Sequence, residues 1–263
     1  MNHHIILTSG RSGSNYLTNT LNQHPKIVNY GEILASMIIP YTLYDRCKRY
    51  KLCNGSVIDY LNYAYTNKKF FYASQIYSAY SHFRKKKPIN FKTWKKINNL
   101  GTKDFFFNYH NKNAVDFLLS NQDIAIIYLY RENMLRRYIS GVFLNKNQFA
   151  STEKNVKIRK VNIDLAKMMT NLNAISKEVA DEQNILKQLQ NHRLITIKYE
   201  DYFADEKSIL AQNKQVFEFL DEEPIHLTSK HKKILPHSWR DQIENYDEFC
   251  DCLANTEYHQ YLD

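Results

Sequence analysis

The sequence predicts an α/β fold with a mostly parallel central sheet, a three-layer arrangement with helices on both faces. Short apolar runs of the kind buried in parallel sheets alternate with segments whose apolar residues recur at helical spacing. Strands that alternate with helices in this way are joined by right-handed crossovers and run parallel. A chain of 263 residues can bury one sizeable core, so we expect a single domain over residues 1–263.

The expected strands follow the apolar runs, and the expected helices follow the 3.6-residue pattern. The strands are Ile5–Thr8, Lys26–Tyr30, Leu100–Phe107, Ile124–Tyr130 and Leu194–Ile197. The fourth run is the strongest, so we expect it near the centre of the sheet. Helices are expected around Tyr16–Leu21, Ala114–Leu119, Met134–Lys146, Asp164–Gln190 and Ile209–Leu220, with two short helices around Leu235–Leu253.

Residues 41–98 are rich in Tyr, Lys and Asn, with helical spacing in two stretches and no clear strand. We expect a mainly helical insertion over the carboxyl edge of the sheet, where acceptor-binding elements lie in open α/β folds. Inside it, Arg84–Lys96 holds seven basic residues and no acid. This run would suit an acidic acceptor, although a solvated, lysine-rich loop is the favoured interpretation.

The net charge of +9 and pI near 9.1 predict an anionic partner without saying which. The first strand begins at residue 5, which leaves no room for a signal peptide, and no apolar run reaches the length of a bilayer. We therefore expect a soluble, cytoplasmic protein without a transmembrane segment. Four cysteines in a chain of this length favour reduced thiols over a disulfide framework or a zinc site.

A glycine-rich loop, Ser9-Gly10-Arg11-Ser12-Gly13-Ser14, joins the first strand to the first helix, which Ser12 or Ser14 is placed to cap. This geometry points backbone N–H groups and the helix dipole at one spot, which predicts a phosphate site. The loop is not a Walker A motif, because Gly13 is followed by Ser14-Asn15 and its only cation is Arg11. An arginine here suits a phosphate ester whose bridging oxygen gains charge, with no metal required.

A second anion site is predicted where the fourth strand ends. Arg131 follows the apolar run directly, and Ser140 lies further along the helix that begins near Met134. Together they could hold a second phosphate. Arg136 and Arg137 share a face with Ser140, but for them a surface position is favoured.

These two motifs resemble those of sulfotransferases that use 3′-phosphoadenosine 5′-phosphosulfate (PAPS), in particular the bacterial carbohydrate-type branch. The loop from Ser9 to Leu17 is similar to their 5′-phosphosulfate loop, and Tyr128–Ser140 is similar to their 3′-phosphate motif. Leu100–Lys103 and Ile197–Asp201 resemble two weaker blocks of that branch. Residues 41–98 are unmatched.

The resemblance implies a P-loop-like fold and a PAPS-dependent sulfotransferase that needs no metal and releases 3′,5′-adenosine bisphosphate (PAP). It implies that Arg131 and Ser140 bind the 3′-phosphate, while Arg11 stabilises the departing bisphosphate. The 5′-phosphate would be bound by the backbone N–H groups of Ser12, Gly13, Ser14, Asn15 and Tyr16. Fixed donors of this kind stabilise charge that develops on a leaving oxygen.

The attacking hydroxyl must lose a proton, and the carbohydrate-directed relatives use a glutamate just after the second strand, where Glu32 lies. Lys103 could hold the transferring sulfonyl group or could point at solvent, and His110 is a fallback base. The glutamate favours a carbohydrate-like or glycolipid hydroxyl acceptor over a phenol or amine. Trp239 could stack on adenine or lie in the core.

Two other functions remain open. A P-loop kinase of a small hydroxyl compound is disfavoured, because the sequence lacks Gly-Lys-Ser/Thr and an aspartate that closes a central strand. A non-catalytic protein that binds polyanions such as nucleic acid is supported by net charge alone.

Overall fold

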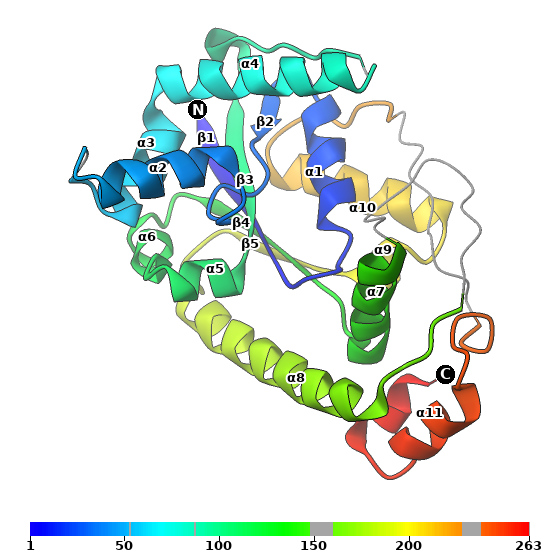
Figure 1. Ribbon diagram of the computed structural model, residues 1–263. Helices are drawn as coiled ribbons and strands as arrows, with labels where there is room; N and C mark the ends of the chain where they lie inside the picture. The colour runs from blue at the N-terminus through cyan, green and yellow to red at the C-terminus, as the bar shows by residue number, and fades with distance from the viewer. Residues whose placement is uncertain (53, 87, 148–159, 228–237, 263) are drawn as a thin grey trace.

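The computed structural model describes residues 1–52, 54–86, 88–147, 160–227 and 238–262. Its centre is a five-stranded sheet in the order β2-β3-β1-β4-β5, with every neighbouring pair parallel (Figure 1). The strands are β1 (Asn2–Thr8), β2 (Ile27–Asn29), β3 (Asn99–Phe105), β4 (Ala125–Tyr130) and β5 (Leu194–Lys198). The predicted α/β fold with a mostly parallel sheet is therefore confirmed.

Helices cover both faces of this sheet because its strands alternate their side chains between two cores. Ile5 and Leu7 of β1 point into one core, and Ile6 points into the other. The core around Ile6 is closed by α1 (Ser14–Gln23) and α10 (Glu206–Phe219). The core around Ile5 and Leu7 is closed by α3 (Val57–Thr66), α5 (Phe106–Asn111), α6 (Val115–Ser120) and α8 (Leu165–Gln188).

A third apolar cluster lies below the sheet, around α7 (Met134–Asn147) and the first half of α8. It includes α11 (Tyr246–Leu253) and the 3-10 helix η2 (Glu257–Tyr261). Of the two short helices expected around 235–253, only α11 is present among the described residues, since residues 238–245 form turns and residues 235–237 lie outside the described part of the chain. Trp239 is 5% exposed in this cluster, in contact with Phe249, which supports the core alternative for this residue.

The insertion contains α2 (Ile39–Arg49), α3 and α4 (Lys68–Arg84). The placement of α4 differs from the expectation, because this helix does not lie over the carboxyl edge. Phe71 of α4 packs instead against Val28 and Leu100 at the β2 side of the sheet. Aromatic residues explain this position, since Phe71 also meets Trp94 edge to face at 5.3 Å, which closes a small core of its own.

None of the described helices combines the length and the apolar character needed to cross a lipid bilayer.

Candidate functional site

The candidate site lies where the parallel strands end, because parallel strands bring their carboxyl ends to one edge of the sheet. The loop after β1, Glu32 after β2, Lys103 near the end of β3, Arg131 after β4 and Tyr199-Glu200 after β5 all reach this edge. Residues far apart in the sequence therefore meet there.

Gly13 ends the loop after β1 and is the N-cap of α1, with a φ of 80°. A Cβ at this position would lie 2.5 Å from the Phe203 ring, so both the conformation and the close approach require glycine. The predicted cap by Ser12 or Ser14 is wrong, since α1 has no side-chain cap and Ser14 is its first residue. The N-cap residue thus adds no side-chain acceptor to the start of α1, which suits an anion site at that place.

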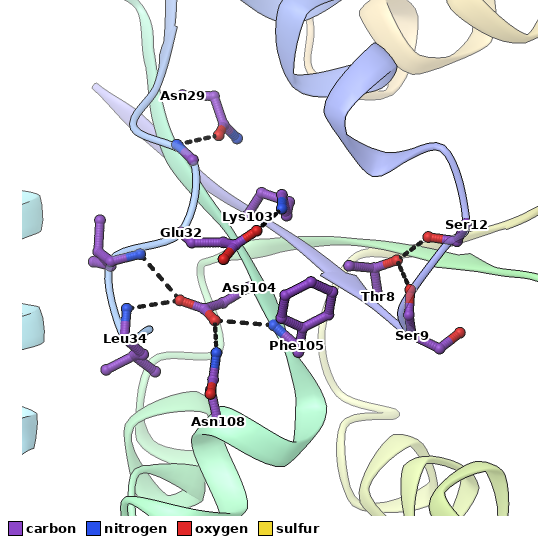
Figure 2. Close-up of polar contacts among 12 residues, drawn as sticks. Thr8, Ser9, Ser12, Asn29, Glu32, Leu34, Lys103, Asp104, Phe105 and Asn108 are labelled. Atoms are coloured by element: carbon purple, nitrogen blue, oxygen red, sulfur yellow. Dashed lines mark hydrogen bonds and ion pairs between the residues drawn. The ribbon is translucent and has the colours of Figure 1, made fainter. Parts of the chain in front are cut away.

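Ser12 fastens the loop to the sheet instead of capping the helix. Its hydroxyl bonds the Thr8 hydroxyl, and Thr8 Oγ1 donates to the Leu129 carbonyl at 2.7 Å, which ties the loop to β4 (Figure 2 shows Thr8 and Ser12). Thr8 and Ser12 are both fully buried. The loop is therefore held in place before any ligand arrives.

Arg11 connects the two predicted anion sites. It has a φ of 63°, a left-handed conformation that is costly for a residue other than glycine and that clusters at functional loops. Its Nε donates to Ser140 Oγ at 3.0 Å, and its carbonyl accepts from Arg131 Nη1 at 3.2 Å. Arg11, Arg131 and Ser140 thus form one continuous polar site.

Arg131 is 8% exposed and is positioned by residues that follow β5. Its guanidinium lies 4.3 Å from the Tyr199 ring centroid, and its Nε lies 3.9 Å from Glu200 Oε1. The Glu200 carboxylate also accepts from the backbone N–H groups of Glu132 and Asn133, each at 3.1 Å. Burial lowers the pKa of Arg131, and Glu200 opposes that shift. The sequence pointed to Glu200 only as part of a weak block.

Arg137 contradicts the expectation of a surface position, since it is 7% exposed. Its Nη2 pairs with the Glu178 carboxylate of α8, and its Nε lies 3.9 Å from where a Cβ on Gly10 would be. Its Nη1 is buried with no hydrogen-bond partner in the described structure. Arg136 is half-buried, with its guanidinium 3.8 Å from the Trp239 ring centroid. Arg137 therefore borders the loop after β1, whereas Arg136 packs on Trp239.

Glu32 and Lys103 form an ion pair at the β2–β3 side of the site (Figure 2). The Lys103 side chain is 3% exposed and the Glu32 side chain 26% exposed, so the lysine does not point at solvent, whereas the carboxylate is accessible. Gly31, with a φ of 73°, turns the chain between β2 and Glu32, and its carbonyl accepts from Lys103 N at 3.0 Å. The ion pair thus rests on a backbone connection between β2 and β3.

Asp104 holds the segment that carries Glu32 and was not singled out from the sequence. Its carboxylate accepts from the N–H groups of Ile33 and Leu34 at 3.1 and 2.8 Å, and also from Phe105 N and Asn108 Nδ2 (Figure 2). It is fully buried, and burial raises its pKa while these donors oppose the shift. In the sequence, only the position of Asp104 directly after Lys103 pointed to a role in the site.

Several predicted residues contribute little through their side chains. Tyr16 packs edge to face on Tyr202 and Phe203, and its N–H bonds the Gly13 carbonyl at 2.9 Å, inside the first turn of α1. Asn15 is exposed and Ser14 is buried. His110 is exposed on α5.

Among the solved structures that this chain resembles, two are sulfotransferases. One, a sulfotransferase from Alicyclobacillus acidocaldarius, has a TM-score of 0.49 at 13% identity, with 100% of this chain and 96% of that chain covered. The other, a sulfotransferase domain from the curacin biosynthetic pathway, has a TM-score of 0.43 at 17% identity, with 86% and 76% covered. No protein-family model and no curated protein matches the sequence.

Glu182 of α8 gives the site region a pH dependence. It is 5% exposed, its Oε2 lies 3.4 Å from the Tyr128 hydroxyl, and burial raises its pKa from 4.5 to about 7, against the opposing charge of Arg137. The folded protein therefore holds this proton more tightly than the unfolded chain. Between pH 4.5 and about 7 the contribution of Glu182 to the free energy of unfolding therefore falls as pH rises.

We expect Glu182→Gln to flatten this pH dependence. The shift corresponds to a loss of about 3 kcal/mol on going from acid to neutral pH, since each unit is worth about 1.4 kcal/mol. Urea unfolding at a series of pH values measures the free energy for both proteins. Parallel pH profiles for wild type and variant would show that Glu182 is not the titrating group.

Proposed function

We propose that this protein is a PAPS-dependent sulfotransferase that transfers a sulfonyl group to a hydroxyl of a carbohydrate-like or glycolipid acceptor. The observation that carries the proposal is the contact between the loop after β1 and the end of β4, made by Arg11 with Ser140 and Arg131. Two adjoining anion sites suit one nucleotide with phosphates at both its 5′ and 3′ positions. Most nucleotides carry no 3′-phosphate, so this pairing supports PAPS over ATP.

Each residue then has a role that its position supports. Arg131 and Ser140 would bind the 3′-phosphate, and the loop N–H groups from Ser12 to Asn15 the 5′-phosphate. Arg11 would stabilise the negative charge that collects on the bridging oxygen as the sulfur–oxygen bond breaks. Arg11 is the cation of this loop. The lysine of a Walker A motif is absent, since Ser14 and Asn15 follow Gly13.

Glu32 would act as the general base. Its accessible carboxylate would accept the proton of the acceptor hydroxyl while the oxygen forms its bond to sulfur. Lys103, buried beside it, would orient that carboxylate and could meet the sulfonyl oxygens. A glutamate in this position favours an aliphatic, carbohydrate-like hydroxyl over a phenol.

Calorimetry with PAP, ATP and a short oligonucleotide, each with and without magnesium, tests the proposal. We expect PAP to bind most tightly and independently of magnesium. Magnesium-dependent binding of ATP would favour a kinase, and salt-sensitive binding of the oligonucleotide alone would favour a polyanion-binding protein. Either result would overturn the proposal. A screen of candidate acceptors with labelled PAPS then identifies the acceptor.

A further inference from the structure

The outer face of α4 exposes large apolar side chains. Ile76, Tyr77, Tyr80 and Phe83 are 63%, 54%, 58% and 73% exposed. Helical spacing places them together on the side away from Phe71 and Gln75, which are buried. Exposed apolar residues scattered over a surface need no explanation, but a row of four on one helix face marks an interaction surface.

Poor packing of α4 does not explain the exposure of this face. The inner side of α4 is occupied by Phe71 in its small core and by Gln75, whose Oε1 accepts from Lys92 N at 3.0 Å. The segment after α4 runs back beside it, since His82 Nδ1 lies 2.7 Å from the Pro88 carbonyl and Trp94 N donates to the Tyr72 hydroxyl at 3.3 Å. Helix and return segment thus form one fixed layer.

Lys92 anchors this layer to the sheet. Its Nζ donates to the carbonyls of Asn22 and His24, each at 2.7 Å, and to that of Ile27. These carbonyls end α1 and begin β2, so the buried ammonium replaces water at a helix end. Lys92 therefore holds the α4 layer against the sheet, and the outer face of the helix is exposed among the described residues.

The segment that contains this face carries charge of one sign. Residues 60–103 contain ten Lys and Arg residues and no Asp or Glu. Of the nine that the structure describes, seven are exposed: Lys68, Lys69, Arg84, Lys85, Lys86, Lys95 and Lys96. Within the part of the chain that the structure describes, none of these seven forms an ion pair. We call this set of seven cations and four apolar residues the α4 surface.

We propose that the α4 surface docks the protein on an anionic membrane. A helix that presents Tyr, Phe and Ile toward the interface, flanked by a cluster of Lys and Arg, has the composition of a peripheral membrane-binding element. Tyr rings and long Lys side chains suit the headgroup region, since both carry an apolar body and a polar end. Nucleic acid would explain the cations and rings but not the aliphatic Ile76, and the acid-free charge fits an anionic lipid surface.

Docking in this way leaves the candidate site open. Figure 1 shows α4 at the opposite end of the sheet from α7 and from the loop between β1 and α1. Lys92 likewise reaches Ile27, the first residue of β2, whereas Glu32 follows the end of that strand. The surface does not depend on the proposed activity, and a bound membrane would not cover the phosphate loop.

Cosedimentation of the full chain with vesicles tests the inference. We expect binding to phosphatidylcholine vesicles that contain phosphatidylglycerol, and at least about tenfold weaker binding to phosphatidylcholine alone. Ile76→Ser/Tyr80→Ser/Phe83→Ser and Lys85→Glu/Lys86→Glu should each weaken binding to the anionic vesicles about tenfold or more. Lys177→Glu/Lys187→Glu on α8 is the matched charge control, and Leu210→Ser on α10 the matched apolar control.

All variants should keep the wild-type thermal unfolding and the wild-type affinity for PAP. Weaker vesicle binding by a variant would then not result from unfolding or from a damaged nucleotide site. Absence of wild-type binding to anionic vesicles would overturn the inference. So would equal binding by the α4 variants and their controls. Binding of an oligonucleotide in place of vesicles, lost in the same variants, would reassign the surface to nucleic acid.

Discussion

Replacement of Glu32 by Gln is expected to lower kcat by about 100-fold to 10,000-fold, the range that a general base contributes. The amide keeps the size and shape of the side chain but cannot accept the proton of the acceptor hydroxyl. Affinity for PAP should stay at its wild-type value, because Glu32 pairs with Lys103 at the β2–β3 side of the site, whereas Arg131 and Ser140 follow β4. Single-turnover assays with labelled PAPS give the rate, and calorimetry gives the affinity.

His110 provides the control for this assignment. It is the other candidate base, and it is exposed on α5 with Nδ1 3.4 Å from Asn111 Oδ1. We expect His110→Asn to transfer sulfonate at the wild-type rate. A Glu32→Gln variant as fast as wild type would show that Glu32 is not the base, and a slow His110→Asn variant would transfer the role to the histidine.

The parts of the site that follow from local sequence could be predicted. A strand that ends in a flexible polar loop, followed by a helix, places Arg11 and Gly13 at a helix start whatever the rest of the chain does. Arg131 follows the most apolar strand, so its position at the carboxyl edge depends on that strand alone. Parallel pairing then brings the two motifs together, as β1 and β4 are neighbours in the sheet.

Features that depend on distant partners could not be predicted in this way. The local sequence around Arg137 predicts a surface residue. Its partner Glu178 lies on α8, which begins at Leu165, so the ion pair depends on how the two helices pack. Asp104 has no visible role until the chain after β2 places two N–H groups against its carboxylate. The position of α4 depends on Phe71 finding a core at the β2 edge, which no periodicity within the helix reveals.

Replacement of Arg131 by Ala is expected to weaken binding of PAP by about 2 kcal/mol or more, which is about 30-fold in Kd. A buried arginine with its guanidinium fixed between Tyr199 and Glu200 loses little freedom when it binds a phosphate. Adenosine 5′-monophosphate, which has no 3′-phosphate, should bind wild type and variant equally. The comparison of both nucleotides on both proteins by calorimetry therefore isolates the 3′-phosphate contact.

Arg136 is the matched control for Arg131, because it is a neighbouring cation whose guanidinium lies over Trp239. We expect Arg136→Ala to change the affinity for PAP by clearly less than Arg131→Ala does. Arg131 also donates to the Arg11 carbonyl and so supports the loop after β1. If that were its main role, both nucleotides would lose affinity to the same extent, and the assignment of Arg131 to the 3′-phosphate would be wrong. Equal loss is thus the result that separates a residue that shapes the loop from one that binds the nucleotide directly.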